Sequence, residues 1–211
     1  MELQVENQAR GTRILFGDLA RRRRELLNKL IDYAEWNGFE EIVLPSLEQA
    51  VIYEDKAGRE VLNQMYTFPD RKGRELCLRP EGTATCQLLA NGQLSRKGEV
   101  GLWYETRCWR YERPQAGRYR EFTQFGMEIL NPKDWDYGGM VELASALMVS
   151  IVPDCVINRK VQRGLGYYTE EGFEILCPQL GAQQQVLGGG KYKEGFGFAI
   201  GLDRLLLALE K

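Results

Sequence analysis

Residues 110–122 read RYERPQAGRYREF, and this charged stretch connects two long runs rich in aromatic and apolar residues, overlapping the end of one and the start of the other. The first run covers residues 102–111 and the second covers residues 119–130. Proline and glycine at positions 114 and 117 favour a turn between them. The stretch therefore predicts two long strands joined by a charged loop.

Polar side chains are predicted to share one face of this strand pair. Because side chains alternate along a strand, Gln124, Gly126 and Glu128 share a face, and Arg110 has the matching parity on the partner strand. Gly126 is expected to leave a gap among them. Buried ionic groups are costly unless they are paired or used. Either this face is exposed to solvent, or it is a binding site.

The loop favours the second interpretation. Glu112, Arg113, Arg118 and Arg120 concentrate charge at the mouth of the polar face. Arginine side chains present a planar fork of donors that suits phosphate groups. We therefore expect a nucleotide to bind on the open sheet face, under this loop.

The remaining elements predict an α+β fold in one domain, residues 1–211, with an antiparallel sheet flanked by helices. Asp18 is expected to cap a helix that runs to about residue 37 and stops at Gly38. A strand at 39–45 follows, then a hairpin of 65–68 with 76–79. Further helices are predicted at 81–90, 139–149 and 202–209, and short strands at 155–157, 165–169, 173–176, 185–187 and 196–200. The glycines at 188–190 indicate close backbone approach.

Composition excludes several kinds of chemistry. The chain of 211 residues has no histidine, so histidine-dependent nucleophilic catalysis and histidine-based metal sites are ruled out. Its five cysteines are scattered without CxxC spacing, which indicates free thiols. The formal charge of −2 gives no overall basic field for nucleic acid. No apolar run is long enough for a membrane span or signal peptide, which predicts a cytoplasmic protein.

Six segments together resemble one family. Residues 110–122 resemble the second signature motif of histidyl-tRNA synthetases, which are class II aminoacyl-tRNA synthetases. MYTF at 65–68, LRPEGT at 78–83 and RGLGYYT at 163–169 are similar to further segments of that family. Residues 195–204 resemble its third motif, and residues 18–45 its first, which lies at a dimer interface. The resemblance covers roughly residues 10–209 and implies a homodimer.

The resemblance implies ATP-dependent activation of an amino acid, with histidine as the expected substrate and Mg²⁺ accompanying ATP. Arg110 and Arg163 are then the catalytic residues, and no protein ligand of the metal is assigned. The residues implied in ATP binding are Arg110, Glu112, Arg118, Phe122 and Arg204. The residues implied in amino-acid binding are Glu81, Thr83, Gln124, Glu128 and Tyr168, of which Glu128 and Tyr168 would read an imidazole.

Several positions depart from the family pattern. Gly166 stands where the family has aspartate, Asp203 replaces a usual glutamate, and Thr123 sits where histidine is common. Lys191 and Lys193 replace arginine and aspartate of a GGRYD-like segment. About a dozen residues separate the helix at 139–149 from Arg163, where a full synthetase carries an insertion domain. An anticodon-binding domain does not follow the third motif, so weak affinity for tRNA is expected.

Three functions remain open at this point. The first is an enzyme that makes an aminoacyl-adenylate, with tRNA or another amine or hydroxyl compound as acceptor. The second is a non-catalytic paralogue that senses histidine, such as a regulatory subunit of ATP phosphoribosyltransferase. The third is a purely structural module. The retained arginines, among them Arg110 and Arg204, favour the first, whereas Gly166 and the missing insertion favour the second.

Overall fold

A computed structural model describes residues 1–54, 58–162, 166–169, 172–181 and 183–210. Its main feature is a seven-stranded sheet in the order β3-β7-β8-β12-β11-β10-β9. The strands are β3 (Glu40–Glu41), β7 (Val100–Trp109), β8 (Glu121–Leu130), β9 (Val156–Val161), β10 (Gly172–Leu176), β11 (Gln185–Tyr192) and β12 (Gly195–Gly201). Six of them pair antiparallel, and the short β3 pairs in parallel with β7. The expected α+β class, with helices against a mainly antiparallel sheet, is confirmed.

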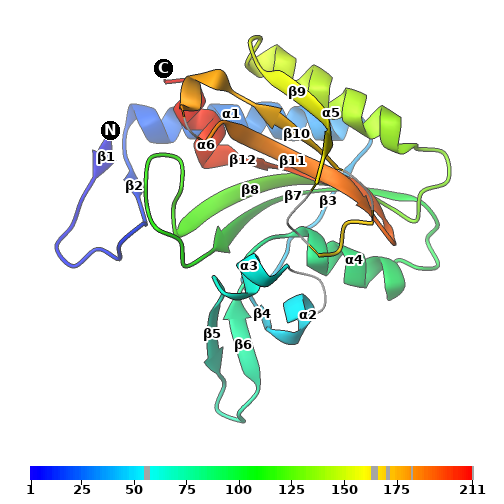
Figure 1. Ribbon diagram of the computed structural model, residues 1–211, viewed down its shortest axis with the longest axis horizontal. Coiled ribbons are helices and arrows are strands. Elements are labelled where there is room, and N and C mark those ends of the chain that lie inside the picture. Colours follow the sequence, from blue (N-terminus) through cyan, green and yellow to red (C-terminus); the bar gives the residue numbers. More distant parts are fainter. Residues whose placement is uncertain (55–57, 163–165, 170–171, 182, 211) are drawn as a thin grey trace.

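Three helices cover one face of this sheet: α1 (Asp18–Trp36), α5 (Tyr137–Ile151) and α6 (Leu202–Ala208). In Figure 1 they gather above and behind the strands. Leu30 of α1, Met148 of α5 and Leu205 of α6 pack in one buried cluster with Phe125 and Phe198 of the sheet. Burial of this apolar face stabilises the fold, and it leaves the opposite face of the sheet open for other tasks.

Smaller elements border the opposite face. Helix α4 (Thr83–Asn91) packs near β7 and β8, through Cys86 and Ala90. A three-stranded sheet of β4 (Leu47–Gln49), β6 (Glu75–Leu78) and β5 (Tyr66–Pro69) adjoins α2 (Val51–Glu54) and α3 (Arg59–Leu62). The β5–β6 hairpin projects downward from the body in Figure 1. This hairpin and α4 match the elements predicted at 65–79 and 81–90.

The first residues form a two-stranded hairpin, β1 (Glu2–Leu3) with β2 (Ile14–Leu15), which we call the N-terminal hairpin. It lies beside the loop between β7 and β8 (Figure 1). A single 3-10 turn, η1 (Pro178–Leu180), precedes β11. Among the described residues, none of the helices combines the length and the apolar character needed to cross a lipid bilayer.

Three sequence-based expectations are corrected by the structure. Asp18 does not cap α1: Gly17, with φ of 59°, occupies the cap position, and Asp18 pairs instead with Arg21 in the first turn. The predicted strand at 39–45 contracts to Glu40–Glu41, because β3 runs parallel to β7 for two residues. The strand predicted at 165–169 is not formed by residues 166–169, where a turn leads to an isolated bridge between Tyr168 and Tyr192.

Candidate active site

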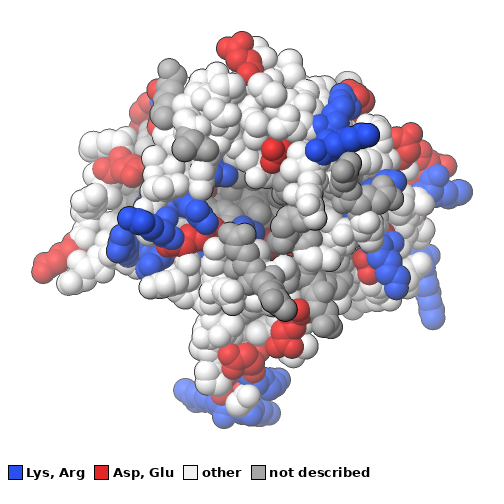
Figure 2. All heavy atoms as spheres, in the orientation of Figure 1, with Lys and Arg blue, Asp and Glu red and all other residues white. Residues whose placement is uncertain are grey.

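A cavity of about 700 Å³ opens on the sheet face that the three helices leave uncovered. Figure 2 shows the hollow at the centre of this face, with basic side chains gathered along its left margin. Nine of the predicted site residues line it. They are Glu81, Thr83, Arg110, Glu112, Arg118, Phe122, Gln124, Tyr168 and Arg204. Glu128 lies beneath the cavity and is fully buried. Arg163 lies outside the described residues.

The loop between β7 and β8 supplies one end of the cavity. Arg110 lies just beyond β7, where its Nε donates a 2.9 Å hydrogen bond to the carbonyl of Pro80. Its guanidinium carbon lies 5.3 Å from the centre of the Phe122 ring. Across the loop, Arg118 forms an ion pair with Glu112. The loop and the first residues of β8 therefore present two guanidinium groups and one aromatic ring to the cavity.

Arg204, in the first turn of α6, reaches the same end from the opposite side. Its Nε donates to the carbonyl of Gly117 at 2.8 Å, Nη1 to the carbonyl of Gln185 at 2.7 Å, and Nη2 to Gln183 Oε1 at 2.7 Å. Burial, followed by the nearby charge of Arg118, lowers the pKa of Arg204. Arg204 thus fixes the position of the loop relative to β11.

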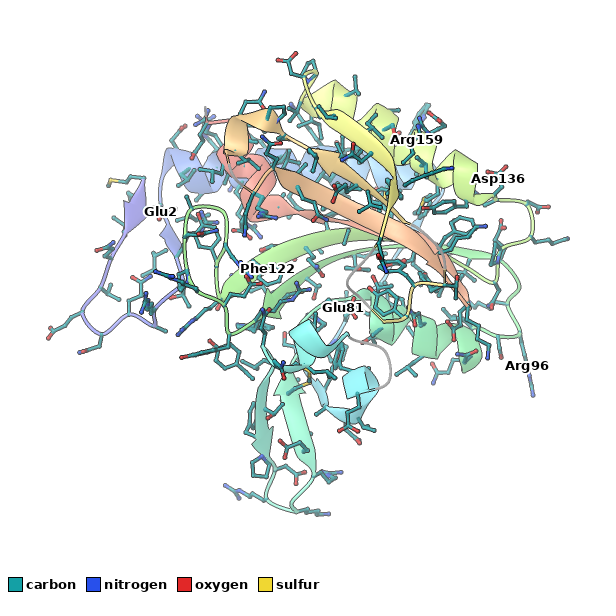
Figure 3. All side chains as sticks on the ribbon, viewed as in Figure 1. Glu2, Glu81, Arg96, Phe122, Asp136 and Arg159 are labelled. Carbon is teal, nitrogen blue, oxygen red and sulfur yellow. The ribbon has the colours of Figure 1, made fainter. Side chains whose placement is uncertain are left out.

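Acidic and amide groups form the other end of the cavity, at the start of α4. Glu81 accepts hydrogen bonds from the backbone N–H groups of Thr83 at 2.7 Å and Ala84 at 2.9 Å. Gln124 Oε1 accepts from the N–H of Gly82 at 3.2 Å. Burial raises the pKa of Glu81, and the two N–H groups oppose this change. Figure 3 shows that Glu81 and Phe122, at the two ends, project from different elements. Glu81, Thr83 and Gln124 are thus brought together, as predicted.

Glu128 is held beneath this acidic end by three hydroxyl groups. Thr83 Oγ1 donates to Glu128 Oε1 at 2.7 Å, Tyr192 donates to Oε2 at 2.8 Å, and Tyr104 donates to Oε1 at 3.3 Å. Thr83 also lines the cavity, so it connects the carboxyl group of Glu128 with the open space. Burial raises the pKa of Glu128 to about 8, although the hydrogen bonds from Thr83 and Tyr192 oppose the rise.

The gap expected above Gly126 is filled by Tyr104. A side chain at Gly126 would overlap the phenol ring of Tyr104, and so would one at Gly82. Tyr104 faces Gly126 directly in the β7–β8 register. The expectation of an open gap was therefore wrong, because a large aromatic neighbour uses the space that glycine leaves. These two glycines let the ring pack against the backbone beneath the acidic end.

Tyr168 lies on the wall of the cavity, beside Tyr192 at the end of β11. It lines the cavity and packs over Gly190, where a side chain would meet its ring. Thr83, Tyr104 and Tyr192 donate hydroxyl hydrogen bonds to Glu128. Tyr167 also lines the cavity, and its hydroxyl donates to Glu81 Oε2 at 3.3 Å.

The sequence analysis missed several residues that contribute to the site. Strand parity would have found Tyr104, since it shares the parity of Arg110 and faces Gly126. Tyr192 follows the predicted close approach at 188–190 by two positions, so the same parity argument would have included it. Gln183 is marked by nothing more than a run of glutamines, and its bond to Arg204 depends on contacts that are distant in sequence.

The described residues contain no group of three or more histidine, cysteine, aspartate or glutamate side chains that would hold a metal ion by itself. Magnesium that arrives with a triphosphate needs few protein ligands, typically one or two carboxylates beside the phosphates. Glu112 and Glu174 are carboxylates that line the cavity. The site therefore fits a metal ion bound mainly by the nucleotide.

The cavity thus has a cationic end and an acidic end on one sheet face. Arg110, Arg118 and Arg204 suit phosphate oxygens, and Phe122 offers an aromatic face for a base. Glu81 and the deeper Glu128 suit a positively charged or N–H-bearing ligand. Such a site offers complementary charge to an anionic group at one end and to an ammonium group at the other.

Fold and site together define the class: this is the catalytic-core fold of class II aminoacyl-tRNA synthetases. In fold the chain is similar to a histidine–tRNA ligase subunit from Alicyclobacillus acidocaldarius, with a TM-score of 0.82 and 15% identity over 99% of this chain and 98% of that chain. It is also similar to an ATP phosphoribosyltransferase regulatory subunit/histidyl-tRNA synthetase from Bacillus halodurans. That match has a TM-score of 0.77 and 15% identity, and covers 97% of this chain and 83% of the other.

The chain belongs to the histidyl-tRNA synthetase family, whose model matches residues 11–150. A curated relative, the histidine–tRNA ligase of Archaeoglobus fulgidus, is 27% identical over 304 aligned positions, which cover 93% of this chain and 74% of the relative. Because the alignment is longer than the 211 residues of this chain, the relative has segments without a counterpart here.

Proposed function

We propose that this protein activates an amino acid, histidine, with ATP to form an aminoacyl-adenylate and pyrophosphate. The observation that carries the proposal is the division of one cavity into a cationic end at Arg110, Arg118 and Arg204 and an acidic end at Glu81. ATP and an amino acid carry the complementary charges. Their reacting groups, the α-phosphate and the carboxylate, would then meet between the two ends.

The chemistry suits a protein without histidine. A carboxylate oxygen of the amino acid attacks the α-phosphorus, the bond from that phosphorus to the bridging oxygen of the β-phosphate breaks, and pyrophosphate leaves with the electron pair. The nucleophile is already ionised, so no general base is needed. Positioning and charge stabilisation then supply the rate. Arg110 would stabilise the charge that develops on the α-phosphate.

The other residues would hold the two substrates. Phe122 would stack on adenine and Glu112 would accept from its amino group, while Arg118 and Arg204 bind the outer phosphates. Mg²⁺ would neutralise charge on the triphosphate, with Glu112 or Glu174 as the nearby carboxylates. Arg163, the second catalytic arginine implied by the resemblance, would act near the carboxylate and the α-phosphate.

At the amino-acid end, Glu81, Thr83 and Gln124 would bind the α-ammonium group. Glu128 would read the imidazole through the opening at Thr83, with Tyr168 on the cavity wall. A charge-assisted hydrogen bond from the ammonium to Glu81 would offset the cost of burying that carboxylate. We further propose that the protein acts in the cytoplasm as a homodimer, and that the acceptor is a tRNA end or another amine or hydroxyl compound.

Amino-acid-dependent exchange of labelled pyrophosphate into ATP, measured with each of the twenty amino acids, tests the proposal. We expect exchange with histidine, and its loss in Arg110→Ala. Arg107→Ala is the matched control: its side chain is exposed, pairs with Glu121, and lies outside the cavity lining. Its exchange rate should equal that of the unchanged protein. Absence of exchange with every amino acid would refute catalysis.

The second candidate is a non-catalytic histidine sensor, like a regulatory subunit of ATP phosphoribosyltransferase. One structural observation favours it: Glu112 and Arg118 neutralise each other, and three donors of Arg204 bind protein acceptors. The fold similarity to the Bacillus halodurans protein also supports it. A sensor would bind histidine with the same affinity with and without ATP and would exchange no pyrophosphate, which separates the two candidates in one set of assays.

A further inference from the structure

Arg13 lies just before β2 in the N-terminal hairpin, and its side chain makes several contacts behind the cationic end of the cavity. Its Nη2 forms an ion pair with Asp203 Oδ1, and each of the two side chains is 11% exposed. Its Nη1 donates to the hydroxyl of Tyr119 at 3.2 Å and to Glu2 at 3.0 Å. Its guanidinium carbon lies 3.8 Å from the centre of the Tyr119 ring. One guanidinium therefore contacts α6 and the β7–β8 loop at once.

The partners of Arg13 are chain neighbours of the residues that line the cationic end. Asp203 precedes Arg204, and Tyr119 follows Arg118. The second oxygen of Asp203 accepts from the N–H of Thr123 at 2.6 Å, next to Phe122. A shift of the guanidinium would therefore move three cavity groups together, although Arg13 itself does not line the cavity.

The backbone beside Arg13 supports the same loop. The carbonyl of Gly11 accepts from the N–H of Arg120 at 2.8 Å. Gly11 has φ of 83°, and a side chain there would overlap Arg120 and touch Pro114. Figure 1 shows the N-terminal hairpin lying alongside this loop. The loop is thus held from behind by residues 11–13 and in front by Arg204, which bonds to Gly117.

We propose that Arg13 is a positioning residue for ATP: it acts through Asp203 and Tyr119 to set the places of Arg204, Arg118 and Phe122. This inference rests on the proposed function, because it names how the ATP end of that site is held. The buried ion pair fits such a role. Loss of the guanidinium would leave Asp203 in a poorly solvated place with one backbone donor, and its side chain would move toward water. Displacements near 1 Å in positioning groups have large effects on catalysis.

Steady-state pyrophosphate exchange and equilibrium dialysis with labelled ATP test the role of Arg13. In Arg13→Ala we expect the KM and the Kd for ATP to rise about tenfold or more, by loss of preorganisation. The KM for the amino acid should change by less than about twofold, because Glu81 and Gln124 lie at the far end. Arg13→Lys keeps the charge opposite Asp203 but loses the planar fork over Tyr119. Its KM and Kd for ATP should therefore lie between those of the unchanged protein and those of Arg13→Ala.

Arg23→Ala is the matched control. Arg23 of α1 also contacts the central strands, through Glu105 of β7 at 2.8 Å and the hydroxyl of Thr123 of β8 at 3.0 Å, but from the helix-covered face. Its ATP constants should not change. If Arg13→Ala does not fold, Arg13→Lys and Tyr119→Phe, which removes one acceptor of Arg13, carry the test.

Two outcomes would overturn the role of Arg13. One is an unchanged ATP affinity in folded Arg13 variants, and the other is an equal rise in both KM values. A protein that binds ATP without any exchange would refute the proposed catalysis and leave the dialysis test of Arg13 intact. The failure of one proposal is thus distinguishable from the failure of the other.

Discussion

The hydroxyl of Tyr192 in β11 donates a 2.8 Å hydrogen bond to Glu128 in β8, across the intervening strand β12. The contact is possible because β12 has glycine at the crossing point. Gly197 pairs with Glu128 on one side and with Gly190 on the other, and a side chain at Gly197 would overlap the Glu128 carboxyl group. Glycine at position 197 of β12 therefore permits a hydrogen bond between β8 and β11, the strands on either side of it.

Gly197→Ala is expected to break this arrangement. The added methyl group would collide with Glu128 and with the carbonyl of Met127, so overpacking should lower the free energy of unfolding by about 1–3 kcal/mol. Amino-acid affinity should fall with it. Urea unfolding and histidine binding by calorimetry measure the two effects. Gly139→Ala, in α5, is the control, since a side chain there meets its neighbours at 3.6 Å or more. Equal stability of the two variants would contradict the steric argument.

Glu128→Gln should change how stability depends on pH. Burial raises the Glu128 pKa from an ordinary 4.5 to about 8, so the folded state keeps a proton that the unfolded chain loses near pH 4.5. The resulting stabilisation is complete below pH 4.5 and is lost as pH rises to about 8, at up to about 1.4 kcal/mol per pH unit. Glutamine cannot ionise, so this part of the slope should disappear.

Urea unfolding of both proteins at pH 5 and pH 8.5 measures that difference. The variant should be close to the unchanged protein at pH 5 and more stable relative to it at pH 8.5. Glu81 and Glu48, whose pKa values burial also raises, are present in both proteins and cancel in the comparison. Parallel pH profiles would show that Glu128 ionises in the folded state as it does in water.

Tyr192→Phe removes one hydrogen bond that favours the ionised form of Glu128. The pKa of Glu128 should therefore rise above about 8 in the variant. Carbon-13 NMR of the glutamate carboxyl groups, titrated from pH 6 to 10, would report the change directly, with Glu128→Gln used to assign the resonance. A titration that stays in place or moves to lower pH would mean that this hydroxyl does not act on Glu128.

Short-range patterns predicted much of the fold and of the site. Two-residue alternation placed Arg110, Gln124 and Glu128 on one face, and the turn residues placed the charged loop above it. The same alternation would have placed Tyr104 beside them, because it faces Gly126 in register. Alternation alone could not predict that the Tyr104 ring fills the space over Gly126.

Long-range contacts explain what could not be predicted. Tyr119 and Asp203, through which Arg13 reaches the site, lie 106 and 190 residues away along the chain, so no local pattern marks Arg13 as part of the site. Tyr192 reaches Glu128 through the register of three strands, which depends on how β12 pairs with both neighbours. The state of charge is also non-local: alternation places Glu128 on the polar face, but its raised pKa comes from burial by residues of other elements.

Glu112→Gln should separate nucleotide binding from stability. The ion pair between Glu112 and Arg118 is partly exposed, with 11% and 31% of the two side chains accessible, so its loss should change the free energy of unfolding by about 1 kcal/mol or less. In the proposed complex Glu112 accepts from the adenine amino group, a task that the amide oxygen retains at lower strength. The KM for ATP in pyrophosphate exchange should therefore rise, while the KM for histidine stays constant.

Arg118→Ala, which removes the other partner of the ion pair, should raise the KM for ATP through lost contacts to the outer phosphates. GTP lacks the amino group at that ring position and should remain a poor substrate for both variants. A variant that loses several kcal/mol of stability while its ATP constants are unchanged would assign the pair a structural role instead.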